Sequence, residues 1–322
     1  MLTKLLIATF ADVLFKRTFI EQASYAFIEP PDLNSVVNHG DHLSGGRKWN
    51  WGQIIKWTVY SLLFVNFFYY AIEEFYISRH TLSLGGSLSD WAREFATTID
   101  ELGWFGLLLA FELETYSLSD ESFEKKKVRW TIRVVRLICY VMLAHTLVAR
   151  LTTVNDFMAV NQAVEINNIC QVADQGISYD FSYEYTDVTA DNCAEITTDT
   201  VFYFTEPTVI VDSAGYELFK KLVYVDLIDV IAWLLVVWSI ELTVWIQNRD
   251  IADGRLMLVT HGAKVLYLVL WADAIWWVSV GHWVWSWDQA LWIIGFWAIE
   301  KNLSDWRDDI REEEFEEQLE KF

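Results

Sequence analysis

Positive charge is scarce in this sequence. Its 322 residues contain 24 Lys and Arg against 45 Asp and Glu, which leaves a formal net charge of −21. Nucleic acid is a polyanion and binds mainly to basic proteins. The negative net charge therefore argues against nucleic acid as the main partner. The polar composition of disordered chains is also missing, because 53% of the residues are hydrophobic.

Motifs that would identify an enzyme or a cofactor site are absent as well. The sequence contains no Walker A motif, dinucleotide-binding glycine fingerprint, HExxH or GxSxG, and no potassium filter sequence. A b-type haem would need two histidines at equal depth on facing helices, and His145 and His261 differ by roughly 15 Å of helix rise. We therefore predict no cofactor, and an enzyme is less favoured than a non-enzymatic protein.

What the sequence does contain is long apolar runs. A helix needs about 20 mostly apolar residues to cross a bilayer. Six segments qualify, of which the second and sixth are short: 53–77, 102–118, 130–154, 222–247, 256–285 and 289–303. The expected fold class is an all-α polytopic membrane protein with about six transmembrane helices and a small, disulfide-stapled, strand-containing extracytoplasmic domain. The Trp-rich stretch 271–287 indicates an interfacial aromatic belt or helix packing, in preference to a quinone or pigment site.

The distribution of Lys and Arg predicts the topology. These residues gather before the first span, between the second and third, and between the fourth and fifth, whereas 155–215 contains none. Because Lys and Arg favour the cytoplasmic side of a membrane, both termini are predicted to be cytoplasmic. The predicted organisation is an interfacial amphipathic segment (1–52), spans 1–3 (53–154), an extracytoplasmic cap (155–219), spans 4–6 (220–303) and an acidic cytoplasmic tail (304–322). A signal peptide is the alternative for the first residues.

Two of the three cysteines fall in the predicted cap. Cys170 and Cys193 lie in the loop assigned to the oxidising compartment, so we expect them to form a disulfide. The stretches SYDFSYEYTDV and TVFYFTEPTVIV alternate as strands do. No histidine lies in this loop, which makes a zinc site unfavourable.

Ionisable residues inside the predicted spans are the main functional signal, because charge at bilayer depth is costly. Helix rise places an outer cluster at similar depth on three spans: Asp273, His145, Asp229, Asp226 and Arg150. Its excess of acid indicates a bound cation, a bound proton or a wet cavity. A buried structural network is the alternative.

A second set of charges lies near the inner interface. It contains Glu112, Glu114, Arg133, Arg136, Glu241, His261 and Lys264. Acids and bases nearly balance there, so the set is interpreted either as a gating network or as pairs that fix helix register.

The leading functional prediction is a channel or transporter for a cation or proton. Its partners would be the lipid bilayer, further copies of the chain in a homo-oligomer, and a protein bound at the acidic C-terminal tail. The first alternative is a non-transporting scaffold or signalling subunit that binds partners through the cap and the tail. The second is a membrane enzyme acting on lipid or quinone.

Overall fold

The computed structural model describes residues 51–113, 125–159, 163–164, 166–247 and 255–296. The chain divides into two compact units, Ile54–Leu234 with Leu268–Phe322, and Met1–Gln53 with Leu235–Tyr267. The first unit holds most of the helices and the whole cap. The second contains the C-terminal part of one long helix and the N-terminal part of the next. The predicted N-terminal amphipathic helix, Glu114 and the acidic tail lie outside the described residues.

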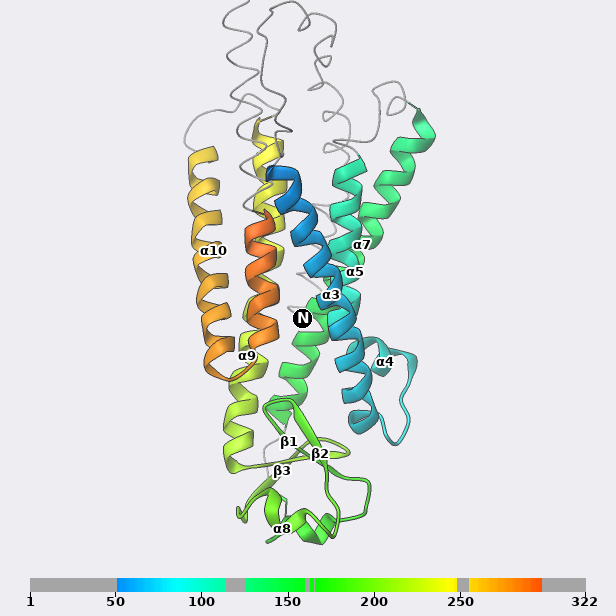
Figure 1. The fold of residues 1–322 in the computed structure, drawn as a ribbon, viewed down its shortest axis with the longest axis vertical. Helices are drawn as coiled ribbons and strands as arrows, with labels where there is room; N and C mark the ends of the chain where they lie inside the picture. Colours follow the sequence, from blue (N-terminus) through cyan, green and yellow to red (C-terminus); the bar gives the residue numbers. More distant parts are fainter. Residues whose placement is uncertain (1–50, 114–124, 160–162, 165, 248–254, 297–322) are drawn as a thin grey trace, which may run out of the picture. The chain divides into compact units, whose positions relative to one another are not determined.

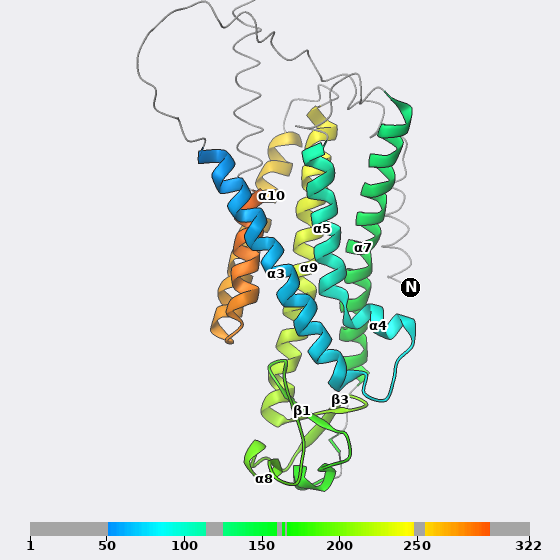
Figure 2. The same cartoon turned by 45° about the vertical axis from the view of Figure 1, so that its right-hand side comes forward.

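Most of the described chain is helical, as predicted. The helices are α3 (Trp51–Thr81), α4 (Leu88–Glu94), α5 (Ala96–Glu112), α7 (Lys126–Ala159), α9 (Ser213–Gln247), α10 (Arg255–Ser279) and a segment at 283–296. In both ribbon views α5 and α7 run side by side (Figures 1 and 2). The predicted fifth span is too long, because the chain turns at Gly281, whose φ of 97° suits glycine, and a new helix begins two residues later.

Two of the described helices are long and apolar enough to cross a membrane, Lys126–Ala159 and Ser213–Ser239. They correspond to the predicted third and fourth spans. Length and composition are the only basis for this correspondence, and the full six-span arrangement stays a prediction.

Helix α5 is held closely by its neighbours. It packs on α7 at Gly103 and Gly106, where a Cβ atom on Gly106 would collide with Cys139 Sγ. Small residues let two helix backbones approach in this way. At its start, the Glu74 carboxylate of α3 accepts hydrogen bonds from the backbone N–H groups of Thr97 and Thr98, at 2.7 and 3.0 Å. This caps donors that the first turn of a helix leaves unpaired.

The cap contains a four-stranded sheet in the order β2-β1-β4-β3. The strands are β1 (Ser178–Phe181), β2 (Glu184–Asp187), β3 (Phe202–Glu206) and β4 (Val209–Asp212), which form two antiparallel hairpins joined by a parallel β1–β4 pair. Both strand-like stretches of the sequence are therefore confirmed as hairpins. The hydrophobic core of the cap includes Phe202 and Ile210, which are fully buried.

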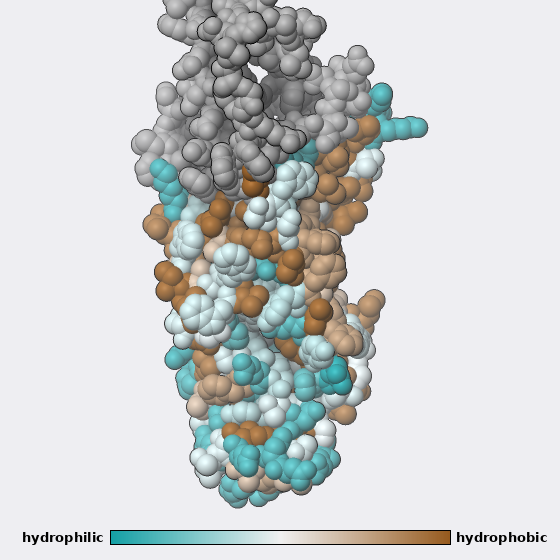
Figure 3. Space-filling model, viewed as in Figure 1, coloured by the Kyte–Doolittle hydropathy of each residue, from teal (hydrophilic) through white to brown (hydrophobic). Residues whose placement is uncertain are grey.

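The cap also contacts the end of α3. His80 Nδ1 lies 2.9 Å from Ser178 Oγ and 3.0 Å from Asp187 Oδ1, and the Thr208 hydroxyl donates to the His80 carbonyl at 2.7 Å. These bonds tie β1 and the β3–β4 turn to the helices. Figure 3 shows that the cap end of the visible face is mostly hydrophilic, whereas hydrophobic side chains are frequent over the helices.

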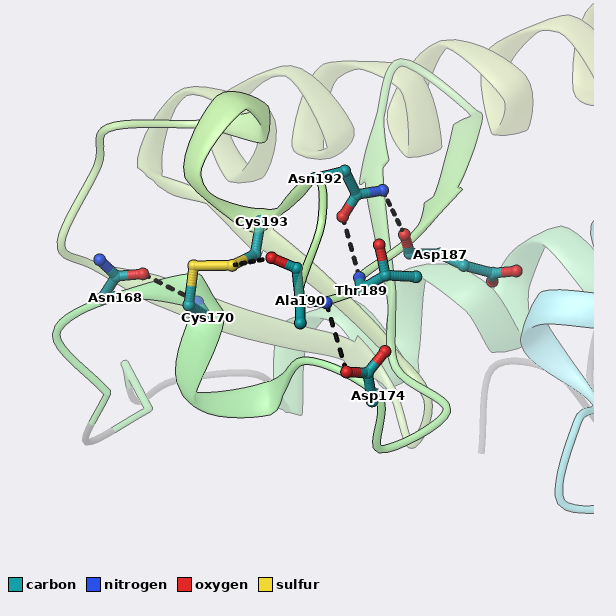
Figure 4. The surroundings of a disulfide bond; sticks show 8 residues. All are labelled: Asn168, Cys170, Asp174, Asp187, Thr189, Ala190, Asn192 and Cys193. Atoms are coloured by element: carbon teal, nitrogen blue, oxygen red, sulfur yellow. Dashed lines mark hydrogen bonds between the residues drawn. A yellow bond between two sulfur atoms is a disulfide. The ribbon is translucent and has the colours of Figure 1, made fainter.

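The predicted disulfide is present. Cys170 lies in the short helix η3 (Ile169–Val172) and Cys193 begins α8 (Cys193–Ile196), with 5.0 Å between their Cα atoms. Side-chain hydrogen bonds hold the surrounding turns: Asn192 Oδ1 accepts from Thr189 N, and Asp174 from Ala190 N (Figure 4). The bridge thus joins two segments whose backbones are already fixed.

Replacing both Cys170 and Cys193 with serine is expected to destabilise the cap by about 3 kcal/mol. The bridge closes a loop between residues 23 apart, and restricting a loop of this size in the unfolded chain has about that effect. Urea unfolding of the cap, followed by pulse proteolysis of the full-length protein, measures the change. Cys139→Ser leaves the bridge intact and is the control. An equal loss of cap stability in Cys139→Ser would contradict the assignment of this stability to the disulfide.

Candidate functional site

A polar cavity of about 110 Å³ lies among the helices of the first unit. That volume holds several water molecules. Its charged lining consists of five carboxylates and one guanidinium group, from Asp100, Glu101, Asp226, Asp229, Asp288 and Arg150. The other lining residues are Tyr70, Thr97, Trp104, Trp233, Trp277, Trp285, Gln289 and Trp292. The cavity therefore combines an excess of acid with many aromatic rings.

Tryptophan side chains hold several carboxylates in and around the cavity. The indole N–H of Trp104 donates to Asp100 at 2.9 Å, and that of Trp277 donates to Asp273 at 3.0 Å, each across one helical turn. Between helices, Trp292 donates to Glu101 at 3.3 Å. A buried indole needs a hydrogen-bond partner. These pairs orient the acids without neutralising their charge.

Arg150 compensates one acid in the lining. Its Nη1 lies 3.7 Å from Asp226 Oδ2, and its Nη2 donates to the Thr97 hydroxyl at 3.1 Å. The same Asp226 oxygen accepts a hydrogen bond of 3.0 Å from the hydroxyl of Tyr183, a residue of the cap. One carboxylate thus connects α7, α9 and the cap.

The remaining acids of the lining are held by neutral amides. Gln289 Nε2 donates to Asp229 at 2.8 Å, and Asn66 Nδ2 donates to Asp288 at 2.8 Å. Asp229 also interacts with Asp273, and Glu101 with Asp288. Two carboxylates side by side in a buried place repel one another unless a proton or a cation lies between them.

Glu101 has the least satisfied carboxylate of this set. Its residue surface is 5% exposed, its Oε2 accepts no hydrogen bond from an N–H or alcohol O–H group of the described residues, and its carboxyl group lies within hydrogen-bonding reach of the Asp288 carboxyl group. A buried acceptor without a hydrogen bond costs free energy. The position suits a ligand or water that can donate a proton or bear positive charge.

The predicted outer cluster is brought together in part. Asp226, Asp229 and Arg150 line the cavity, and Asp273 lies against Asp229. His145 is not among the lining residues, and its buried Nδ1 has no hydrogen-bond partner among the described residues. Four of the five residues of this cluster therefore lie near one another in the structure. Their role in an ion path stays a prediction.

The predicted inner network is described only in part. Glu112 forms an ion pair with Lys56 at 2.6 Å and accepts a hydrogen bond of 2.6 Å from Tyr60. Arg133 and Arg136 lie on α7, whereas Lys264 is exposed on α10 in the second unit. Glu241 and His261 belong to α9 and α10, but their side chains lie outside the described part, as does the whole of Glu114. Lys56 is the partner of Glu112 that sequence reasoning missed.

Sequence reasoning also missed three acids of the cavity, Asp100, Glu101 and Asp288. Glu101 directly precedes the predicted span 102–118, and Asp288 directly precedes the predicted span 289–303. Both lie in helices, Glu101 in α5 and Asp288 in the segment 283–296. The Asp–x–x–x–Trp spacing at Asp100 and Asp273 is a signal that could have indicated the indole–carboxylate pairs.

The fold and the cavity together define a mostly helical protein with a disulfide-bonded cap and an acidic internal site. No family model matches the chain, and neither a curated protein nor a solved structure matches it. Function is therefore argued from the site itself.

Proposed function

We propose that this protein is a membrane channel or transporter that moves a proton or another cation through the acid-lined cavity. The observation that carries the proposal is the charge of the lining, in which five carboxylates face one guanidinium group. Inside a protein such an excess of negative charge favours a positively charged occupant. Water-sized space beside these acids gives the occupant room.

The outer surface of the helices supports a membrane location. Large apolar side chains are exposed along several helices, among them Val65 on α3, Val141 on α7, and Leu268 and Ile275 on α10, each at least 61% exposed. Water-soluble monomers rarely expose apolar residues on such a scale, whereas lipid favours them. Two helices also have the length and composition of spans.

The proposal keeps the topology predicted from the sequence. Six helices would cross the bilayer with both termini in the cytoplasm and the cap outside, in an assembly of several copies. A disulfide in the cap agrees with an oxidising compartment. The cap has no Lys or Arg between residues 155 and 215, so its charge would attract cations to the outer mouth.

Each group of the site has a role in this proposal. Arg150 fixes Asp226, so the remaining lining acids supply the free negative charge. Gln289 holds Asp229, while Asp229 and Asp273 pass a proton or hold a cation between them. Ligands for a tight metal site are lacking, because no group of three His, Cys, Asp or Glu converges within the described residues. Weak, exchangeable binding suits conduction.

Flux measurements in liposomes test the proposal. Wild-type protein is expected to carry proton or cation current under an applied potential, and Asp229→Asn is expected to lower it at least tenfold. Asp191→Asn is the matched control, because Asp191 is exposed in the cap and loses the same charge. Equal flux in all three proteins would place the path elsewhere. If no protein carried flux, the proposal would be wrong, and a scaffold bound to a partner through the acidic tail would replace it.

A further inference from the structure

The β1–β2 hairpin of the cap turns through two residues with an uncommon backbone. Ser182 and Tyr183 have φ values of 62° and 63°, in the left-handed region. Two-residue hairpin turns of this kind strongly favour Asn-Gly, because a side chain with a Cβ is disfavoured there. A tyrosine in the second position is therefore unusual, and its side chain must make contacts that offset the backbone strain.

Those contacts are made on the helices. The Tyr183 ring lies 5.4 Å from the Trp285 ring and 6.1 Å from that of Phe219, and its hydroxyl donates to Asp226. The neighbouring Ser182 hydroxyl lies 3.0 Å from His282 Nε2. Both residues of the turn are thus anchored to helical segments far away in the sequence.

The anchors belong to the cavity. Asp226 and Trp285 line it, and Arg150, which also lines it, binds the same Asp226 oxygen as Tyr183 does. Tyr183 itself comes from the cap. It is not a lining residue, but it contacts two lining residues, Trp285 and Asp226, from the side of the cap.

We propose that Tyr183 is the residue that closes the cavity on the side of the cap. Opening requires the turn to withdraw, which breaks the hydrogen bond to Asp226 and the Ser182–His282 contact. Withdrawal also frees the turn from a backbone conformation that its side chains disfavour. The closed state is then a balance between strain in the turn and contacts on the helices. This inference rests on the proposed function only in assigning the cavity to an ion path.

A cysteine reporter measures access to the cavity directly. Thr97→Cys places a thiol in the lining, in a Cys139→Ala background so that no other free cysteine is present. A membrane-impermeant, cationic methanethiosulfonate reagent is added on the side of the cap. Tyr183→Gly is expected to raise the labelling rate at least tenfold, because glycine keeps the turn and removes the ring.

Ser182→Gly is the matched control. It relieves backbone strain one residue earlier and removes the Ser182–His282 contact, but it leaves the Tyr183 ring and its hydrogen bond to Asp226 in place, so its labelling rate should stay within about threefold of the parent. Tyr183→Phe keeps the ring and removes only the hydrogen bond, and an intermediate rate is expected. If Thr97→Cys reacts equally fast with and without the ring, or if Ser182→Gly matches Tyr183→Gly, the proposal is wrong.

The labelling result is independent of transport. Faster labelling in Tyr183→Gly with no flux in any variant would support the closure by Tyr183 and contradict the proposed function. Unchanged labelling together with flux that depends on Asp229 would contradict the closure by Tyr183 and support the proposed function.

Discussion

Replacing Glu101 with glutamine is expected to lower cation flux at least tenfold. Glu101 is almost fully buried, and its Oε2 accepts no hydrogen bond from an N–H or alcohol O–H group of the described residues, so it is the acid best placed to bind a mobile positive charge. Glutamine has nearly the same shape and keeps an oxygen for Trp292. The fold should therefore survive while the charge is lost.

A double-mutant cycle with Asp288 separates a shared site from two independent ones. Glu101 and Asp288 interact, and Asn66 holds the far side of Asp288. If the two acids bind one cation or share one proton, Asp288→Asn should add little to the loss already caused by Glu101→Gln. If the flux losses of the two single variants multiply in the double variant, the two acids have separate roles. Flux retained in Glu101→Gln would remove this acid from the path.

The stability of the cap is expected to fall as pH rises from about 4 to 7, and Asp180 is one of two buried acids responsible. Asp180 is 1% exposed on β1, and its Oδ1 has no hydrogen-bond partner among the described residues. Burial raises the pKa of Asp180 from 3.8 to about 7, and the nearby charges of Glu206 and Glu184 act in the same direction. The folded cap therefore holds a proton that the unfolded chain releases above pH 4.

The direction and size of the change in cap stability with pH follow from the linkage between proton binding and folding. A folded-state pKa above the unfolded value stabilises the cap fully below about pH 4, and this stabilisation is lost as pH rises through 7. A shift of this size corresponds to roughly 4 kcal/mol. Burial and the charge of Glu94 also raise the pKa of Glu206 to about 7, so this residue contributes in the same window.

Urea midpoints of the cap at pH 5 and pH 8, measured by pulse proteolysis of the full-length protein, test this prediction. The wild-type cap should unfold at a lower urea concentration at pH 8. Asp180→Asn should remove about half of the difference and leave the part that belongs to Glu206, because the pKa of each group in the folded cap is about 7. A cap equally stable at both pH values would show that Asp180 is ionised in the folded state.

The sequence predicted more of the cap than of the cavity, for a physical reason. Strands alternate with a period of two, and hairpins pair residues close in the chain, so the stretches that became β1–β2 and β3–β4 were visible directly. The pairing of Cys170 with Cys193 followed from compartment and count. The parallel contact between β1 and β4 was not predictable, because it depends on how the two hairpins pack.

The cavity contains residues that the hydropathy of the sequence did not predict. Apolar runs locate the centres of helices well, but their ends are uncertain by several residues. Glu101 and Asp288 each lie one residue outside a predicted span, so hydropathy did not mark them, although both line the cavity. The Trp residues at 277 and 285, interpreted as belt or packing residues, also line the cavity.

By itself, the sequence determined that the chain is mostly helical, that a small strand-containing domain interrupts the helices, and that a disulfide staples this domain. Helix rise also predicted that certain acids lie at similar heights on the predicted spans. Only the tertiary structure decided which helix faces meet. That choice placed Arg150 on Asp226, left His145 outside the cavity lining and brought Tyr183 from the cap onto the site. Contacts between distant segments depend on the packing of whole helices, and one sequence carries no local signal for them.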